Sequence, residues 1–131
     1  MVALICMFIL TLCSGFCEGV MNKLQFHYHK SIFMNFSNTM FWNPLYSWKN
    51  KYKNGNPGHG PRFFLSTTWL VALTDGWHLF KLLRNVLLFA SLPIAGYYAH
   101  STLALIIIIV LCRTAYGAGF WLSYYKILRP A

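Results

Sequence analysis

Three long apolar stretches dominate the chain, separated by one polar segment and one short turn. They cover residues 1–20, 85–100 and 101–125. Roughly 20 apolar residues in a helix cross the hydrocarbon of a bilayer. The pattern therefore predicts an all-α membrane protein with three transmembrane helices and a tail at residues 126–131. The second stretch is short, and it spans only if Leu82 and Leu83 join it and Arg84 reaches back to the interface.

Residues 66–84 have a different pattern. Trp69 and Trp77 belong to an apolar set that recurs at helical spacing, whereas His78 and Lys81 fall on the opposite face. Ser66 or Thr67 supplies an N-cap residue. We therefore expect an amphipathic helix that lies in the headgroup plane or packs against the bundle.

Residues 21–65 keep neither a helical nor a strand period, which predicts an irregular extramembrane segment. Residues 41–53 mix aromatic residues with lysines, and residues 54–61 are dense in Asn, Gly and Pro. Such aromatic and basic mixtures anchor proteins at a membrane surface. The predicted contacts to lipid headgroups are Trp42, Trp48, Lys49, Lys51, Lys53, Arg62, Lys81 and Arg84.

Composition supports the membrane interpretation. Only 10% of the 131 residues are charged and 57% are hydrophobic, too few charges to cover a water-facing surface. Eleven Lys and Arg stand against two acids, for a net charge of +9. Nucleic acid would attract such a charge, but the cations lie beside apolar spans and among Trp and Tyr. Anionic lipid headgroups are therefore the favoured partner.

The distribution of basic residues predicts the orientation. Eight Lys and Arg lie between Lys23 and Arg84, and two follow the third span. Because cytoplasmic flanks are rich in Lys and Arg, the middle segment and the C-terminus are expected in the cytoplasm, with the N-terminus outside.

Arg113 falls near the centre of the third span, where an unpaired charge costs about 3 kcal/mol or more. The chain has two acids, Glu18 and Asp75. We expect an intramembrane ion pair between Arg113 and Glu18, either structural or part of an ion or proton path.

Asp75 and His78 are three residues apart, so on a helix they share a face. With His27 and His29 they form a candidate cluster of four metal ligands at the interface. The alternative is structural, with Asp75 orienting His78. The sequence has no GxSxG motif and no phosphate-binding glycine loop. This favours a protein that is not an enzyme, and we expect no resident cofactor unless the cluster binds metal or heme.

Small residues recur four apart in two spans. Gly15 and Gly19 lie in the first span, and Ala115 and Gly119 lie in the third. Such pairs allow two helix backbones to approach closely. The first and third spans are therefore expected to pack on each other or across a homo-oligomer.

Part of the chain resembles a group of small uncharacterised membrane proteins from Bacteroidota and their phages. The resemblance covers residues 26–84 and rests on Trp42-Asn43-Pro44, on residues 47–55 (SWKNKYKNG), and on residues 66–71 and 74–81 (STTWLV and TDGWHLFK). It implies a bacterial inner membrane and carries no known activity.

Three functions remain open at this point. The first is a membrane component whose basic aromatic segment binds anionic lipid and docks a protein partner or another copy. The second is a holin-like protein that permeabilises the membrane. The third is an interfacial protein that binds metal or heme through the histidine and aspartate cluster.

Overall fold

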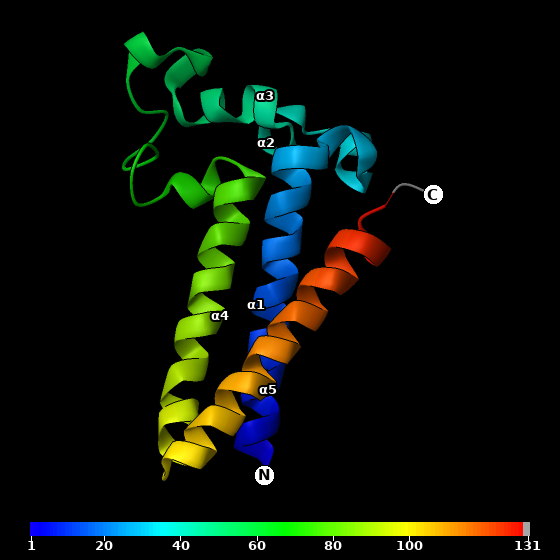
Figure 1. Cartoon of the computed structure of the whole chain (residues 1–131). Helices are drawn as coiled ribbons and strands as arrows, with labels where there is room; N and C mark the ends of the chain where they lie inside the picture. The colour runs from blue at the N-terminus through cyan, green and yellow to red at the C-terminus, as the bar shows by residue number, and fades with distance from the viewer. Residues whose placement is uncertain (130–131) are drawn as a thin grey trace.

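The computed structural model describes residues 1–129, which form a three-helix bundle with a chain of short helices packed at one end (Figure 1). The long helices are α1 (Val2–His27), α4 (Gly76–Tyr98) and α5 (Thr102–Trp121), and the π-helical segment η7 (Leu122–Ile127) continues α5. These three helical stretches are long and apolar enough to cross a membrane. The predictions of an all-α chain and of three helices able to span a membrane are therefore confirmed.

Helix α1 is the centre of the bundle. It packs along both α4 and α5, which touch each other little. Met7, Ser14 and Leu24 of α1 are almost completely buried. By contrast, Phe89 of α4 is 69% exposed and Ile109 of α5 is 57% exposed. In a membrane these outer apolar surfaces of α4 and α5 would face lipid, whereas α1 faces protein on two sides.

Helix α4 differs from its prediction at both ends. The helix expected over residues 66–84 does not form in its first part, where residues 64–70 are turns and η6 (Val71–Leu73) is a single short 3₁₀ turn. The α-helix begins only at Gly76, because the carboxylate of Asp75 caps it by accepting a bond from the backbone N–H of His78. It then runs unbroken past Arg84 to Tyr98. The amphipathic helix and the second span are thus one helix, and the predicted boundary at residues 84–85 is wrong.

A tight turn joins α4 to α5. The side chain of Ser101 accepts a bond from the backbone N–H of Ala104 at 3.2 Å and so caps α5. Pro93 lies inside α4 without ending it, as is common in membrane helices. At the far end of α5, helical structure extends to Ile127, so the predicted tail starts later than residue 126. Residues 130 and 131 of that predicted tail lie outside the described part of the chain.

The polar segment is more ordered than predicted. Its first seven residues, 21–27, belong to α1. The remainder forms a string of one-turn helices, with Asn38 and Asn43 capping two of them through their side-chain oxygens. The short helices of this string are η1 (Tyr28–Lys30), η2 (Ile32–Asn35), α2 (Thr39–Trp42), α3 (Pro44–Ser47), η3 (Trp48–Lys51), η4 (Lys53–Gly55) and η5 (Pro57–His59).

A small apolar core holds this string onto the end of the bundle. Its buried members come from α1, from the short helices and from the residue after η7: Val20, Leu24, Tyr28, Phe33 and Leu128. Trp42 packs against this core and stacks on Phe33 with ring centroids 5.0 Å apart. Gly76 lies under the Trp42 ring, where a Cβ atom would overlap the indole. The string is therefore docked on both α1 and the start of α4.

The turn-rich residues form a closed loop. Lys53 donates its backbone N–H to Gly60, and Arg62 donates its own to Lys51, at 3.0 and 2.9 Å. Gly60 has a φ of 75°, in the region that favours glycine. The loop stands away from the long helices at the end of the bundle (Figure 1).

The two ends of the bundle differ in character. The N-terminus and the α4–α5 turn lie at one end, and the string of short helices and the end of η7 lie at the other (Figure 1). The basic middle segment and the last basic residues are therefore on the same side of the bundle. This is the arrangement that three membrane crossings require.

Glycines form the contact between α1 and α5. A Cβ atom on Gly15 would overlap the backbone carbonyl of Tyr116, and one on Gly119 would overlap that of Leu12. Gly19 lies against the side chain of Ser123. Ala115 is half-buried and lines a shallow apolar pocket between the same helices. The close approach expected of these small residues therefore occurs within one chain, between its first and third long helices.

Candidate functional site

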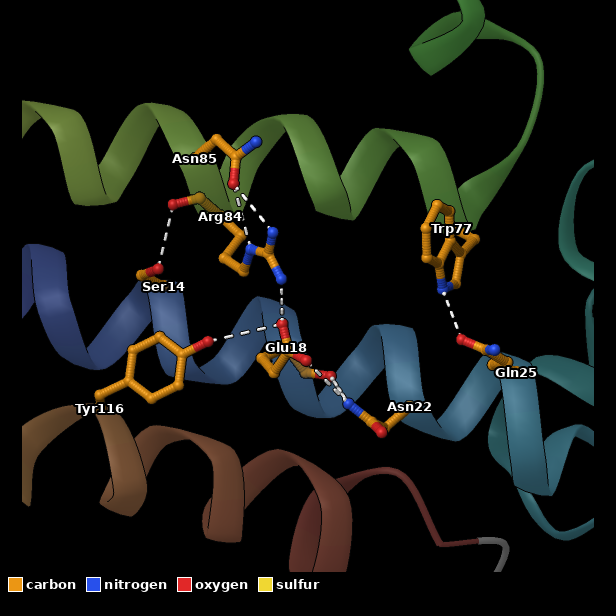
Figure 2. Close-up of polar contacts among 8 residues, drawn as sticks. All are labelled: Ser14, Glu18, Asn22, Gln25, Trp77, Arg84, Asn85 and Tyr116. Atoms are coloured by element: carbon orange, nitrogen blue, oxygen red, sulfur yellow. Dashed lines mark hydrogen bonds and ion pairs between the residues drawn. The ribbon is translucent and has the colours of Figure 1, made fainter. Parts of the chain in front are cut away.

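A polar cluster inside the bundle joins all three long helices. At its centre, the guanidinium of Arg84 on α4 donates to the carboxylate of Glu18 on α1, with Nη1 and Oε2 2.5 Å apart (Figure 2). Each side chain keeps about a quarter of its surface accessible in the isolated chain. Because hydrocarbon solvates charge poorly, this ion pair would greatly lower the cost of burying either group in a membrane.

Neighbouring side chains use the remaining hydrogen-bonding groups of the pair. Asn22 donates to Glu18 Oε1 at 3.1 Å, and the hydroxyl of Tyr116 on α5 donates to Glu18 Oε2 at 3.4 Å. The side-chain oxygen of Asn85 accepts from Nε and Nη2 of Arg84. The arrangement is a satisfied polar network, and such networks fix one helix register over others.

The predicted partner of Glu18 is wrong. Arg113 makes no ion pair within residues 1–129, and its guanidinium lies 5.9 Å from the centre of the Tyr116 ring. The prediction that Arg84 contacts lipid headgroups is also wrong, since Arg84 turns into the bundle toward Glu18 (Figure 2). The physical reason is the longer α4: starting at Gly76, it carries Arg84 two turns into the helix and level with Glu18.

A cavity of about 370 Å³ opens beside the pair. Arg113 reaches this cavity together with Glu18, Arg84 and Tyr116. The site thus holds two guanidinium groups and one carboxylate. Such a set favours a structural role, in which opposite charges hold one another in position.

Asp75 and His78 form a second polar contact at the start of α4. Asp75 is 3% exposed and its Oδ2 atom lies 2.7 Å from Nδ1 of His78. The hydroxyl of Thr74 donates to the same carboxylate at 3.3 Å. Asp75 thus caps α4 and orients His78, which is the structural alternative raised by the spacing.

The predicted four-ligand cluster does not assemble. His27 packs edge-on against the Tyr124 ring, and His29 packs against the ring of Tyr28. Over residues 1–129, no three side chains of His, Cys, Asp or Glu converge as a metal site. The structure brings together Asp75 and His78 and leaves the other two histidines apart from them.

The predicted headgroup residues divide into two groups. Trp42 packs in the small core, and Arg62 donates to the side chain of Asn50, which in turn donates to the carbonyl of Thr74 at 2.5 Å. The second group consists of exposed or half-buried side chains. Trp48 is 46% exposed, with the ammonium of Lys49 lying 5.5 Å from its ring centre. The other three cations of this group are Lys51 over Tyr52, Lys53, and Lys81 over Trp77.

Sequence reasoning missed four members of the polar cluster, Ser14, Asn22, Asn85 and Tyr116. No sequence motif marks Tyr116 or Asn85, although Asn85 directly follows Arg84. Ser14 donates to the backbone carbonyl of Arg84 at 3.0 Å and is fully buried. Polar residues inside otherwise apolar runs were the available signal, because in lipid each needs a partner.

In comparison with known proteins, no family model, curated protein or solved structure matches this chain. The case for a function therefore rests on the geometry described above.

Proposed function

We propose that this protein is a multi-pass component of a bacterial inner membrane that is not an enzyme. Its string of short helices, together with the turns and η6 that follow it (residues 28–73 in all), binds the anionic cytoplasmic leaflet and presents a docking surface for a protein partner. The N-terminus would then lie outside and the C-terminus in the cytoplasm.

The observation that carries this proposal is the fate of the two side-chain carboxylates. Glu18 is used by Arg84, and Asp75 is used by the cap of α4. Over residues 1–129, Arg84 alone among the Lys and Arg side chains has a carboxylate partner. The lysines of the string are therefore not neutralised by this fold, and anionic lipid at the membrane surface is the nearest abundant source of opposite charge.

The aromatic residues support the same placement. Trp48, Phe64 and Trp69 are 46%, 80% and 86% exposed at the end of the bundle. Trp side chains are enriched at the boundary between hydrocarbon and water, where the ring is partly apolar and the N–H stays wet. Lysines beside them add attraction to anionic headgroups, worth about 1 kcal/mol each near the surface.

Hydrogen exchange in nanodiscs tests the proposal. We expect backbone amides of residues 36–73 to exchange more slowly in phosphatidylglycerol than in phosphatidylcholine, with the difference reduced by high salt. The triple variant Lys49→Gln, Lys51→Gln, Lys53→Gln should remove most of that difference. Lys126→Gln, which changes a charge outside the string, is the matched control. Equal exchange of this region in both lipids would contradict the proposal.

The holin-like alternative makes an opposite prediction. Under our proposal, reconstitution into dye-loaded vesicles leaves the dye inside, since the polar residues of the bundle are paired within one chain. Release of the dye at low protein-to-lipid ratio would favour the permeabilising function instead.

A further inference from the structure

A basic groove at the end of the bundle is not used by any feature described above. It lies between the last turns of α1 and the π-helical segment η7, and its volume is about 590 Å³. Six residues line it: Lys23, His27, Lys30, Tyr124, Tyr125 and Arg129. From this groove we infer a specific binding site for the phosphate of one anionic phospholipid headgroup.

The charge of the groove requires an anion. Lys23, Lys30 and Arg129 contribute three positive charges, and over residues 1–129 none of them forms an ion pair. The two acidic side chains of the chain are engaged elsewhere, Glu18 with Arg84 and Asp75 with the α4 cap. Like charges gathered around one cavity repel one another, and a bound phosphate would replace that repulsion with charge-assisted hydrogen bonds.

Lys23 is the strongest pointer to a ligand. It is 6% exposed, although lysine is rarely buried without a partner. Its ammonium lies 4.7 Å from the centre of the Tyr124 ring, which partly compensates the charge. Tyr124 is in turn fixed by stacking on Phe120, with ring centroids 5.2 Å apart. The groove thus has a rigid floor with a cation held in it.

The position of the groove favours a lipid over a free phosphate ion. It lies where α1 and η7 end, at the end of the bundle that carries the string of short helices. Basic pockets between membrane helices at the cytoplasmic side bind anionic lipid headgroups, and a volume of this size accommodates one. The choline of a zwitterionic lipid would be repelled by the same cations. The π-helical turns of η7, a rare geometry found often at functional sites, present both tyrosines to the groove.

This site deepens the proposed function, on which it rests for placing this end of the bundle at the anionic leaflet. Its residues, which include Lys30 of η1, are separate from Lys49, Lys51 and Lys53, the lysines varied in the exchange experiment above. A failure of either idea is therefore visible alone, because one is read by hydrogen exchange over residues 36–73 and the other by a lipid bound to the purified protein.

The test is native mass spectrometry of the detergent-purified protein titrated with phosphatidylglycerol, phosphatidylcholine or inorganic phosphate. We expect one phosphatidylglycerol to bind in preference to phosphatidylcholine. Arg129→Gln and Lys30→Gln, both at exposed positions, should each weaken it about fivefold, the equivalent of one interfacial cation. The control Lys126→Gln removes a charge that lies over the Trp121 ring outside the groove, and should change affinity less than about twofold.

Three results would overturn the inference. These are equal weakening by Lys126→Gln and Arg129→Gln, equal binding of both lipids, and displacement of phosphatidylglycerol by inorganic phosphate of comparable affinity. The last would identify the ligand as a free phosphate. Lys23→Gln adds a further readout, because thermal stability measured without lipid separates loss of binding from loss of folding.

Discussion

The two sides of helix α1 are built on different principles. Toward α5, glycines allow the backbones to touch, and a single added carbon would overlap a carbonyl. Toward α4, the contact is polar: Ser14, Glu18 and Gln25 each bond to a residue of that helix (Figure 2). In lipid the hydrophobic effect does not drive helices together, so close packing and hydrogen bonds must do so. In this chain close backbone packing dominates the α5 side of α1, where Tyr116 adds a hydrogen bond to Glu18, and hydrogen bonds link α1 to α4.

The largest effect should come from filling the glycine contact. Gly15→Leu should lower the free energy of unfolding by more than about 3 kcal/mol, since the overlap is with the backbone of Tyr116 and no rotamer relieves it. Unfolding in a titration of mixed micelles with dodecyl sulfate measures this. The control is Gly96→Leu on α4, where an added Cβ meets no atom within 4 Å. Similar losses for both would mean that glycine is needed for another reason.

Loss of the ion pair on the α4 side of α1 should give the second-largest loss of stability. Arg84→Gln leaves the carboxylate of Glu18 without its cation and should cost about 2 kcal/mol, below the value for a fully buried pair because both groups are a quarter exposed. The double variant Glu18→Gln, Arg84→Gln should recover part of that loss, which the same titration would show as a positive coupling energy. Arg113→Gln is the control and should cost about 0.5 kcal/mol, the value of a cation–π contact. A larger coupling between positions 18 and 113 would restore the pair predicted from the sequence.

Among the test variants, the smallest effect should come from the loss of a single hydroxyl. Ser14→Ala removes a bond between helices and should cost about 0.6 kcal/mol. Ser91→Ala, at a similarly buried position, removes a hydroxyl that bonds to Leu88 within its own helix and should cost less. If the two serines behave alike, hydrogen bonding across this contact contributes little to the packing of α1 on α4.

The three apolar helices were predictable because each segment contains enough consecutive apolar residues to cross a membrane as a helix. The start of α4 was not found, although Asp75 followed by an apolar helical run is a good signal for an N-cap. Ser66 and Thr67 offered competing caps upstream, and periodicity through Trp69 favoured them. In the structure that stretch folds as turns, with Ser66 donating to the carbonyl of Lys51 at 2.7 Å.

The wrong prediction of the partner of Glu18 followed from the same error. With α4 starting at Gly76, Arg84 lies inside a span and faces α1, whereas an earlier helix ending at residue 84 placed it at the interface. Two arginines were then candidates for one carboxylate, and only the relative register of three helices decides between them. The spacing of Gly15 and Gly19 indicated a close approach of the first and third spans, but no local pattern along the chain reports the register of α4 against α1. The string of short helices was likewise hidden, because one-turn helices carry no period.

The central position of α1 also constrains how the protein is made. Glu18 and Arg84 are 66 residues apart in the chain, so the acid is synthesised well before its cation. At about 5 to 20 residues per second, the ribosome needs roughly 3 to 13 seconds to supply α4. During that interval the first helix carries Glu18 without its cationic partner. Packing of α1 against α4 and α5 therefore occurs late, after both of these helices have been synthesised.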